Sequence, residues 1–553
     1  MYQTRLSLLR RLLLAAALAA AGVFGAAGCA RGPTVIPPAE RTTIDRKLVE
    51  YPAGVELQVV AQDLTGPVDC AVDKAGNLIV AEGGHGKYDP RLYGIRKDGT
   101  TFNIYPAHRP LPFPLSWIKG GFRIYGPVGG IAVHDGQIFV SHRDRHGFGT
   151  ITAFTYDGQH RTIVGKLPAQ GDYGMGDIAI DPFQGRLWFG VGAATNSGVV
   201  GLDNWAAGWV KRYPSFSDKP FTELRLLGYR FDTPNPRAGL FGGKDVAGTA
   251  PFQPFNSRYR GRIPPAENGR PTAAVYSCSP AGGDLRVEAW GIRFPRGIAF
   301  NEDGVPYATN NGMELRGTRP VKDDPDTLIR IVSVTWYGWP DFSADLRPIS
   351  AQRFQPPQEL LVTYQELTEV IDHEASGPPG SRLMAPLAHL VNGVFEPLSG
   401  AAGVAFVPPE GPLARYSGQA IVALSGDRAP FATSGLKLRG PTGYRVVRLD
   451  MRKDPREREV IDFVRNTAGV PRSRQRLTYH HVALERPVAV TFDPADGSMY
   501  LVDFGVLEMR KGREFVKPRT GRIFKLAPQA TTQVPPPIAE AEAPEPPGAS
   551  TSQ

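Results

Sequence analysis

The amino-acid sequence predicts an all-β fold, a six-bladed β-propeller with long loop insertions, which a lipoprotein signal peptide precedes. Two observations carry the fold prediction. The 553 residues include 63 glycines and 52 prolines, a content typical of a chain with many strands and turns. In addition, one hairpin pattern recurs six times. With 41% hydrophobic and 21% charged residues, the composition is that of a folded protein rather than of a disordered one.

Each repeat consists of an apolar strand, a turn that contains glycine, and a second apolar strand. One such hairpin cannot bury both of its faces, so the copies must pack on one another. Six similar units at irregular spacing favour six propeller blades, and two stacked β-sandwiches are the alternative. The longest gap, at about residues 200–275, shows no clear helix and is a typical place for a binding function. The copies occupy residues 66–83, 126–144, 176–192, 295–312, 400–426 and 486–505.

The N-terminus has the features of a bacterial lipoprotein leader. Residues 1–11 are basic, residues 12–28 are small and apolar, and Cys29 follows directly. The Ala26-Ala27-Gly28-Cys29 sequence resembles the lipobox, in which the cysteine is acylated and becomes the new N-terminus. An ordinary secretory peptide with an incidental cysteine is the alternative. We expect a membrane-anchored protein on the periplasmic side, at the outer membrane of a two-membrane cell, because Ala30 rather than Asp follows.

Composition predicts the remaining domain boundaries. After the signal peptide (1–28), residues 29–50 are expected to be a polar tether and residues 51–527 the propeller. Residues 528–553 are rich in proline and alanine and contain no Lys or Arg. Such a segment cannot bury enough apolar surface to order itself, so we expect a disordered tail without chemistry.

Charge and cysteine content exclude several functional classes. The formal net charge of +9 falls to +6 when the three arginines of the leader are removed, and no basic run with interleaved aromatic residues occurs. Nucleic-acid binding is therefore not expected. Three cysteines exclude a disulfide-rich scaffold and a four-cysteine zinc site. Besides Cys29, the chain has Cys70 and Cys278, either as a disulfide or as two separate buried thiols. Serine-hydrolase, zinc-protease, phosphate-loop and dinucleotide-binding motifs are absent from the sequence.

Several separated motifs point to one family. Residues 289–320 read AWGIRFPRGIAFNEDGVPYATNNGMELRGTRP, and YGWPDF follows at residues 337–342. Over residues 55–526 the chain resembles the glucose/sorbosone dehydrogenase family, most closely its sorbosone-dehydrogenase-like branch. The members of this family are six-bladed propellers that use pyrroloquinoline quinone (PQQ). Further matching segments are ATNSGVVGLDN at 194–204, GDRAP at 426–430, GYRVVRLD at 443–450 and ERPVAVTFDPADGSMYLVDFG at 485–505.

The resemblance implies oxidation of a sugar or aldose. The quinone takes the hydride, a protein base takes the proton, and calcium polarises the quinone oxygens. Electrons would pass to an acceptor in the cell envelope. By position, the resemblance implies that the cofactor contacts Arg293, Arg486, Arg428 and Tyr125, and that calcium is held by Asn311, Gly312, Asp324 and Asp326.

The chain differs from the family at the position of the catalytic base. Gly171 and Asp172 match a Gly-Asp pair that precedes the catalytic histidine of the family, but Tyr173 takes the place of that histidine. A tyrosine with its ordinary pKa near 10 is a poor base at neutral pH unless cations lower that pKa. We expect Arg293 or calcium to supply that charge, so Tyr173, Asp172 and Arg293 form the predicted catalytic group. His142 and His146 are alternative bases if they reach inward, and a solvated loop is the simpler interpretation.

Three functions remain open from the sequence. The leading hypothesis is a PQQ- and calcium-dependent sugar dehydrogenase anchored in the cell envelope. The second is a propeller that has lost its base and binds a carbohydrate or a partner. The third is a calcium-dependent lactonase-like hydrolase on the same scaffold. The substitution at Tyr173 is the feature that separates the first hypothesis from the other two.

Overall fold

A computed structural model describes residues 32–106, 122–236, 238, 245–361, 366–378, 380–436, 438, 440–475, 482–510 and 512–529 of the chain. The predicted leader, the lipidation site Cys29 and residues 530–553 of the predicted tail lie outside these residues. No helix among the described residues is long and apolar enough to cross a membrane.

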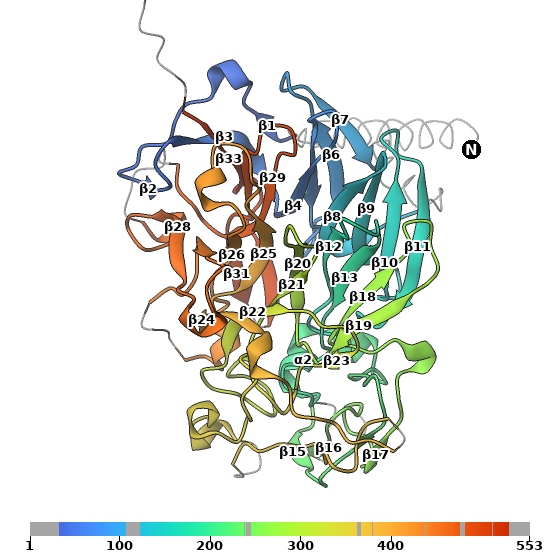
Figure 1. Ribbon diagram of the computed structural model, residues 1–553. Coiled ribbons are helices and arrows are strands. Elements are labelled where there is room, and N and C mark those ends of the chain that lie inside the picture. Colours follow the sequence, from blue (N-terminus) through green and yellow to red (C-terminus); the bar gives the residue numbers. More distant parts are fainter. Residues whose placement is uncertain are drawn as a thin grey trace, which may run out of the picture.

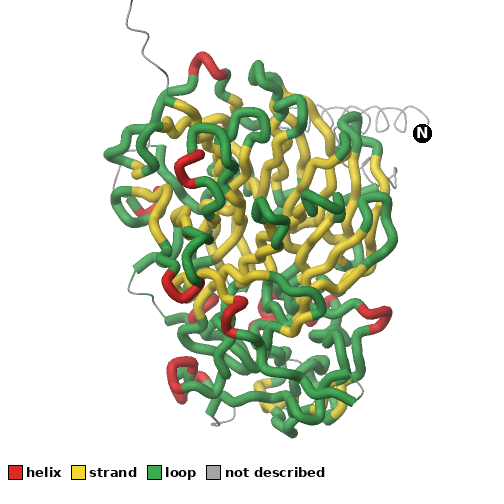
Figure 2. Tube along the Cα trace, in the orientation of Figure 1, coloured by secondary structure: helices red, strands yellow, loops and turns green. Residues whose placement is uncertain are grey.

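Six sheets surround a central channel, and each predicted repeat forms the two innermost strands of one sheet. Each innermost strand contacts that of the next sheet, and the sixth contacts the first, so the ring is closed. The structure therefore confirms the six-bladed propeller and excludes two stacked sandwiches. Figure 1 shows these sheets in the upper part of the view, and Figure 2 shows that loops dominate the lower part. The innermost strands are β4 (Pro67–Val72), β8 (Tyr125–His134), β12 (Met175–Ile180), β20 (Pro295–Phe300), β25 (Ala401–Phe406) and β29 (Pro487–Phe492).

The outer strands follow in sequence order within blades one to five. Blade one adds β5 (Leu78–Glu82), β6 (Arg91–Ile95) and β7 (Thr101–Tyr105), and blade two adds β9 (Gln137–Arg143), β10 (Gly149–Phe154) and β11 (His160–Leu167). Blade three adds β13 (Leu187–Val191), β18 (Ala274–Cys278), β19 (Arg286–Trp290) and β23 (Thr335–Trp336). Blade four adds β21 (Pro306–Asn310), β22 (Pro325–Arg330) and β24 (Val391–Pro397). Blade five adds β26 (Ala420–Leu424), β27 (Arg445–Leu449) and β28 (Ile461–Asn466).

The sixth blade closes the ring with strands from both ends of the chain. It combines β29, β30 (Met499–Asp503) and β33 (Gly521–Pro528) with β3 (Val55–Leu64), which pairs antiparallel with β33. The predicted tether is wrong for the residues before β3. Thr34–Val35 form β1 on the edge of β3, and Val49–Glu50 form β2 on the edge of β28. These short additions cover two outer edges that would otherwise expose unpaired backbone groups.

Two residue patterns explain why the repeats pack as blades. The second strand of each hairpin is mostly apolar, and Leu187–Val191 and Ala420–Leu424 are apolar throughout, because these strands are buried on both faces between neighbouring blades. Glycines in the innermost strands allow close approach: a Cβ atom at Gly176 would lie 2.2 Å from the carbonyl oxygen of Pro295 in the next blade. Any side chain at Gly176 would therefore push two blades apart.

Two insertions extend from one end of the propeller. The first, between β13 and β18, contains β14 (Leu224–Arg225), β15 (Phe231–Pro234), β16 (Val246–Thr249) and β17 (Arg262–Ile263). It also contains two helices, α2 (Leu202–Ala207) and α3 (Trp209–Arg212), so the expectation of no helix is wrong. These helices are too short to show a helical period in the sequence. The second insertion joins β22 to β24, and the two insertions meet at a bridge between Leu226 and Ile371. Short 3₁₀ turns occur at η1 (Pro38–Glu40), η3 (Glu267–Gly269), η4 (Gln352–Phe354), η5 (Gln358–Leu360), η6 (Ala388–Leu390), η7 (Ala414–Tyr416), η8 (Phe431–Thr433), η9 (Pro455–Glu457) and η10 (Arg472–Arg474).

The two cysteines of the described propeller do not pair. Cys70 lies on β4 of blade one and Cys278 on β18 of blade three, and both are free and buried. The second of the two sequence alternatives, separate buried thiols, is therefore the one that the structure shows.

Candidate functional site

A cavity of about 1030 Å³ lies where the innermost strands begin, at the end of the channel. All six blades contribute to its wall. A hairpin of β31 (Leu507–Arg510) and β32 (Arg513–Val516), from the sixth blade, and the start of α3 line it as well. The insertion predicted to carry a binding function thus supplies part of this wall.

Arginines from several blades line the cavity. Arg143 of blade two, Arg296 of blade four, Arg428 of blade five and Arg486 of blade six all line it. Burial, and next the charges of Arg428 and Arg486, lower the pKa of Arg296 to about 10. The Nε atoms of Arg143 and Arg428 are buried and have no hydrogen-bond partner among the described residues. Both guanidinium groups line the cavity, so cationic groups lie beside any anion that binds there.

The residues predicted to contact the cofactor separate into two groups. Arg428, Arg486 and Tyr125 line the cavity, whereas Arg293 is not part of its wall and is only 2% exposed. Arg486 donates from its two terminal nitrogens to three backbone carbonyls of blade five and to the hydroxyl of Tyr444, so those nitrogens join blades six and five. Arg428 donates from Nη2 to Glu514 at 3.1 Å and keeps Nε free. Arg428 is therefore the better placed of the two for an anionic ligand.

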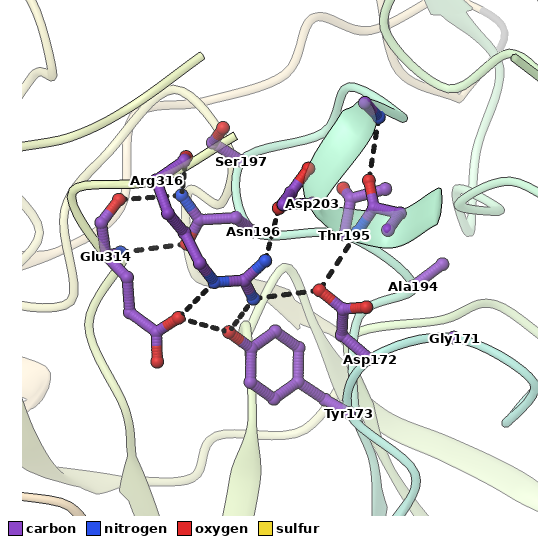
Figure 3. A network of polar contacts seen from close by, with 12 residues as sticks. Gly171, Asp172, Tyr173, Ala194, Thr195, Asn196, Ser197, Asp203, Glu314 and Arg316 are labelled. Atoms are coloured by element: carbon purple, nitrogen blue, oxygen red, sulfur yellow. Dashed lines mark hydrogen bonds and ion pairs between the residues drawn. The ribbon is translucent and has the colours of Figure 1, made fainter. Parts of the chain in front are cut away.

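Tyr173 is held in a network of ions (Figure 3). Its hydroxyl accepts a hydrogen bond from Nη2 of Arg316 at 2.7 Å and donates one to Glu314 at 3.2 Å, as Figure 3 shows. The same hydroxyl also accepts a hydrogen bond from Arg293. The guanidinium carbon of Arg293 also lies 4.2 Å from the centre of the tyrosine ring. Tyr173 and Arg293, two residues of the predicted catalytic group, are therefore in direct contact.

The same network does not activate the phenol as a base. Burial raises the pKa of Tyr173 to about 12, and Arg293 and Arg316 offset the effect of burial only in part. At neutral pH the hydroxyl keeps its proton. In this arrangement Tyr173 acts as a hydrogen-bonding centre of the wall, and Arg293 by itself does not bring the pKa of the phenol below its ordinary value.

Asp172 holds the insertion against the network. Its carboxylate accepts hydrogen bonds from the indole of Trp209 at 2.7 Å, from the amide of Asn204 at 2.9 Å and from Nη2 of Arg316 at 2.8 Å. All of these donors come from this chain, so Asp172 positions the helices α2 and α3 beside the cavity. Asp172 was predicted to belong to the catalytic group, and the contacts that it makes in the structure are those of a positioning residue.

Arg316 and Glu314 are the members of the site that sequence reasoning did not single out. Arg316 is 2% exposed and forms ion pairs with Asp172, Asp203 and Glu314. Burial by itself would raise the pKa of Glu314, but the charges of Arg316 and Arg293 lower it to about 2. Both residues lie inside the motif at residues 289–320. Their opposite charges, two positions apart, were the sequence feature that could have marked them as part of the site.

The carbonyls predicted to hold calcium are occupied by a guanidinium. The backbone oxygens of Asn311 and Gly312 accept N–H groups from Nη1 of Arg293 at 3.2 and 2.5 Å. Asp326 lines the cavity, but one of its oxygens accepts the N–H groups of Gly400 and Ala401 and the hydroxyl of Ser399, and the other accepts the N–H of Gly312. These oxygens are already engaged by donors from the chain.

Asp324, the fourth residue predicted to hold calcium, does not supply a free ligand either. Asp324 is not part of the cavity wall and accepts the backbone N–H groups of Met313 and Ala344. Burial raises its pKa to about 8, although these two N–H groups act to lower it. Over the described ranges no cluster of three or more His, Cys, Asp or Glu side chains is placed to hold a metal. Asn311, Gly312, Asp324 and Asp326 therefore do not fit a calcium ion.

The two histidines considered as alternative bases lie outside the cavity wall. His142 is 1% exposed, and its ring nitrogens contact the carbonyl of Arg143 at 2.7 Å and the hydroxyl of Thr152 at 2.8 Å. Burial lowers its pKa to about 4. His146 is exposed and contacts Arg145. The histidine that does line the cavity is His85, which follows two glycines after β5 and which sequence reasoning missed.

A pair of aspartates lies in the wall formed by the innermost strands. Asp69 of β4 and Asp177 of β12 line the cavity, and their carboxyl groups are hydrogen bonded to each other. Burial raises the pKa of both, and the charge of Asp69 raises that of Asp177 further. Such a pair shares one proton and can take up a second one.

The fold and the site define a six-bladed propeller with an arginine-lined cavity in its channel. No known family model matches the chain, and no curated protein matches it. Among solved structures it is similar to a Trichoderma reesei carbohydrate-active enzyme of family AA12, with 13% identity and a TM-score of 0.48 over 88% of this chain and 99% of that one. It is also similar to the PQQ domain of a Coprinopsis cinerea pyranose dehydrogenase, with 13% identity and a TM-score of 0.47 over 89% and 100%. A third similar structure is the PQQ-bound aldose sugar dehydrogenase of Streptomyces coelicolor, with 14% identity and a TM-score of 0.42 over 86% and 99%. These likenesses are distant and concern the fold.

Proposed function

We propose that the protein is an oxidoreductase that binds PQQ in the arginine-lined cavity and oxidises a sugar or aldose of the sorbosone or glucose type. The observation that carries this proposal is the cluster of Arg143, Arg296, Arg428 and Arg486 around one cavity, with two guanidinium nitrogens unpartnered among the described residues. PQQ is a tricarboxylate, and planar guanidinium groups are suited to carboxylates. The motifs at residues 289–320 and 337–342 support the same function by resemblance.

The chain must supply binding and proton transfer around this cofactor. When bound, the quinone supplies the hydride acceptor. Arg143, Arg296 and Arg428 would hold its carboxylates, and a sugar hydroxyl would lose its proton to the pair Asp69 and Asp177, because the hydroxyl of Tyr173 is protonated at neutral pH. Electrons would then pass to an acceptor in the envelope. No step is assigned to calcium, because the residues predicted to hold it do not fit.

A second candidate function is a binding module for a carbohydrate or a partner. The observation that favours it is the loss of the family histidine at Tyr173, whose hydroxyl is engaged by Arg293, Arg316 and Glu314. The lactonase-like hypothesis loses its support, since it required calcium at residues that do not fit it.

Replacing Tyr173 and Asp69 separates these functions. We expect wild-type protein to bind PQQ and to reduce a dye with one or more aldoses of a panel. Tyr173→Phe should keep turnover within about threefold but lower the free energy of unfolding by about 1–3 kcal/mol, because two buried guanidinium groups lose an acceptor. Asp69→Asn should lower turnover about 100-fold and leave PQQ binding unchanged, because Asp69 has the lower pKa of the pair and is the member that accepts the proton. The measurements are dye reduction, PQQ titration by absorption, and urea unfolding.

The outcomes of this experiment divide clearly. PQQ binding without turnover on any aldose would favour the binding module. Absence of PQQ binding would overturn the proposed function altogether. Turnover that falls about 100-fold in Tyr173→Phe would indicate that Tyr173 is the catalytic base and would contradict the role given to the aspartate pair.

We also propose that the chain is a lipoprotein on the extracytoplasmic side of the membrane. The support is the lipobox-like sequence that ends at Cys29. Replacing Cys29 by serine should release the protein from the membrane fraction or block removal of the leader. The measurement is fractionation followed by immunoblotting, with Cys70→Ser as the control. Membrane retention of a processed Cys29→Ser protein would contradict the lipid anchor.

A further inference from the structure

Arg293 lies at the centre of a cage of oxygen atoms. It follows β19 and precedes β20, and it is one of the largest fully buried side chains of the propeller. Its Nε donates to the carbonyl of Asn196 at 2.9 Å, and its Nη2 donates to the side-chain oxygen of the same residue at 2.8 Å. Its Nη1 donates to the carbonyls of Asn311 and Gly312. The hydroxyl of Tyr173 is the fifth acceptor.

One carboxylate completes the surroundings of the guanidinium. An oxygen of Glu314 lies 3.6 Å from Nη2 of Arg293. Three backbone carbonyls, one amide oxygen, one phenol oxygen and one carboxylate together form the kind of ligand set that a hard divalent cation takes. The set is drawn from three separate segments of the chain, at residues 173, 196 and 311–314, so a positive charge at its centre joins blades three and four. Without that charge, the oxygens would face one another in a buried space.

We propose that the guanidinium of Arg293 fills, as a built-in cation, an oxygen cage of the kind that takes calcium, so that this protein holds the site together without the metal. The proposal concerns Arg293 and the cage oxygens alone and does not depend on the function proposed above. It explains why Asn311 and Gly312 carry the right backbone oxygens for a cation and yet do not fit calcium. It also implies that removal of the guanidinium creates a site for a hard cation.

Calcium should affect the Arg293→Ala variant and not the wild type. We expect the wild-type Tm to change by less than about 1 °C in 10 mM calcium or in chelator. Arg293→Ala should melt at a lower temperature, and 10 mM calcium should raise its Tm by about 2–5 °C, with half-saturation near 1 mM, because only one carboxylate is present. Terbium should bind the variant and show luminescence sensitised by Tyr173. The measurements are thermal unfolding across a calcium titration and terbium emission.

Two further variants make this test specific. Phe354→Ala removes a core side chain with 0% exposure and no oxygen cage, so it should be destabilised without any response to calcium. Arg293→Ala combined with Glu314→Gln should lose the response to calcium, because the carboxylate is removed. If Arg293→Ala does not fold in the absence of calcium, its refolding yield with and without 10 mM calcium takes the place of Tm.

Two results would overturn the proposal. One is a wild-type Tm that rises by several degrees with calcium and falls with chelator, since a cation would then bind beside Arg293. The other is an Arg293→Ala protein whose Tm or refolding yield is independent of calcium, or responds no more than Phe354→Ala. A calcium response confined to Arg293→Ala would support it, whether or not the protein binds PQQ.

Discussion

Arg316→Ala should lower the free energy of unfolding by about 3–5 kcal/mol at pH 7, because it leaves buried carboxylates without their cation. Arg316 is 2% exposed and pairs with Asp172, Asp203 and Glu314. Its loss would also remove a donor to Tyr173 and the link between α2 and the cavity. Urea unfolding followed by tryptophan fluorescence measures the change. Arg456→Ala, which removes an exposed ion pair to Asp454, is the control and should have no measurable effect.

The effect of Arg316→Ala should depend on pH. In the wild type, nearby arginines lower the pKa of Glu314 to about 2, below its usual value of 4.5. The stabilisation from Glu314 is therefore present above about pH 4.5 and is lost as the pH falls through 2. In the variant, the carboxyl groups that have lost Arg316 become neutral as the pH falls. The free-energy cost of burying unpaired carboxylates then decreases. The difference in stability between the two proteins should narrow from pH 7 to pH 4, and a variant as stable as wild type at pH 7 would contradict this account.

Arg428→Glu should weaken PQQ binding by about 100-fold or more. The change removes a guanidinium that lines the cavity and places a second carboxylate beside Glu514, its present partner. A tricarboxylate would then meet repulsion where it now meets a donor. Equilibrium titration followed by the absorption of PQQ measures the dissociation constant.

A matched control for this charge reversal lies in the same blade. Arg452 is exposed, pairs with Asp450 in the turn after β27, and does not line the cavity, so Arg452→Glu should leave PQQ binding unchanged. Equal losses in both variants would indicate a general charge effect. An unchanged dissociation constant in Arg428→Glu would exclude Arg428 from the anion site.

The repeats made the propeller predictable. Each hairpin carries a local signal, apolar strands around a glycine turn, and each became the inner half of one blade. The sequence did not indicate that Thr34–Val35 and Val49–Glu50 add strands to blades six and five, because two-residue strands have no periodicity to detect. The helices α2 and α3 escaped prediction for the same reason.

The candidate site was predictable in part. Tyr173, Asp172 and Arg293 do come together, and Arg428, Arg486 and Tyr125 do line the cavity. The roles of Tyr173 and Arg293 were not predictable, because they depend on burial and on Arg316, which lies 143 residues beyond Tyr173 along the chain. The calcium residues matched by position, but position does not show which donor already occupies a carbonyl.

The sequence by itself determined the number of blades and the hairpin that forms the inner half of each, because strand and turn preferences are local and repeat six times. The pairing of β3 with β33, which closes the ring, was visible only in the tertiary structure. Only the tertiary structure decided what the polar residues do. Whether a phenol titrates, whether a carbonyl is free for a cation and which guanidinium faces a cavity all depend on neighbours brought from other blades. Desolvation and Coulomb interactions between those neighbours set the charges of the site, and both depend on distances that a single stretch of sequence does not contain.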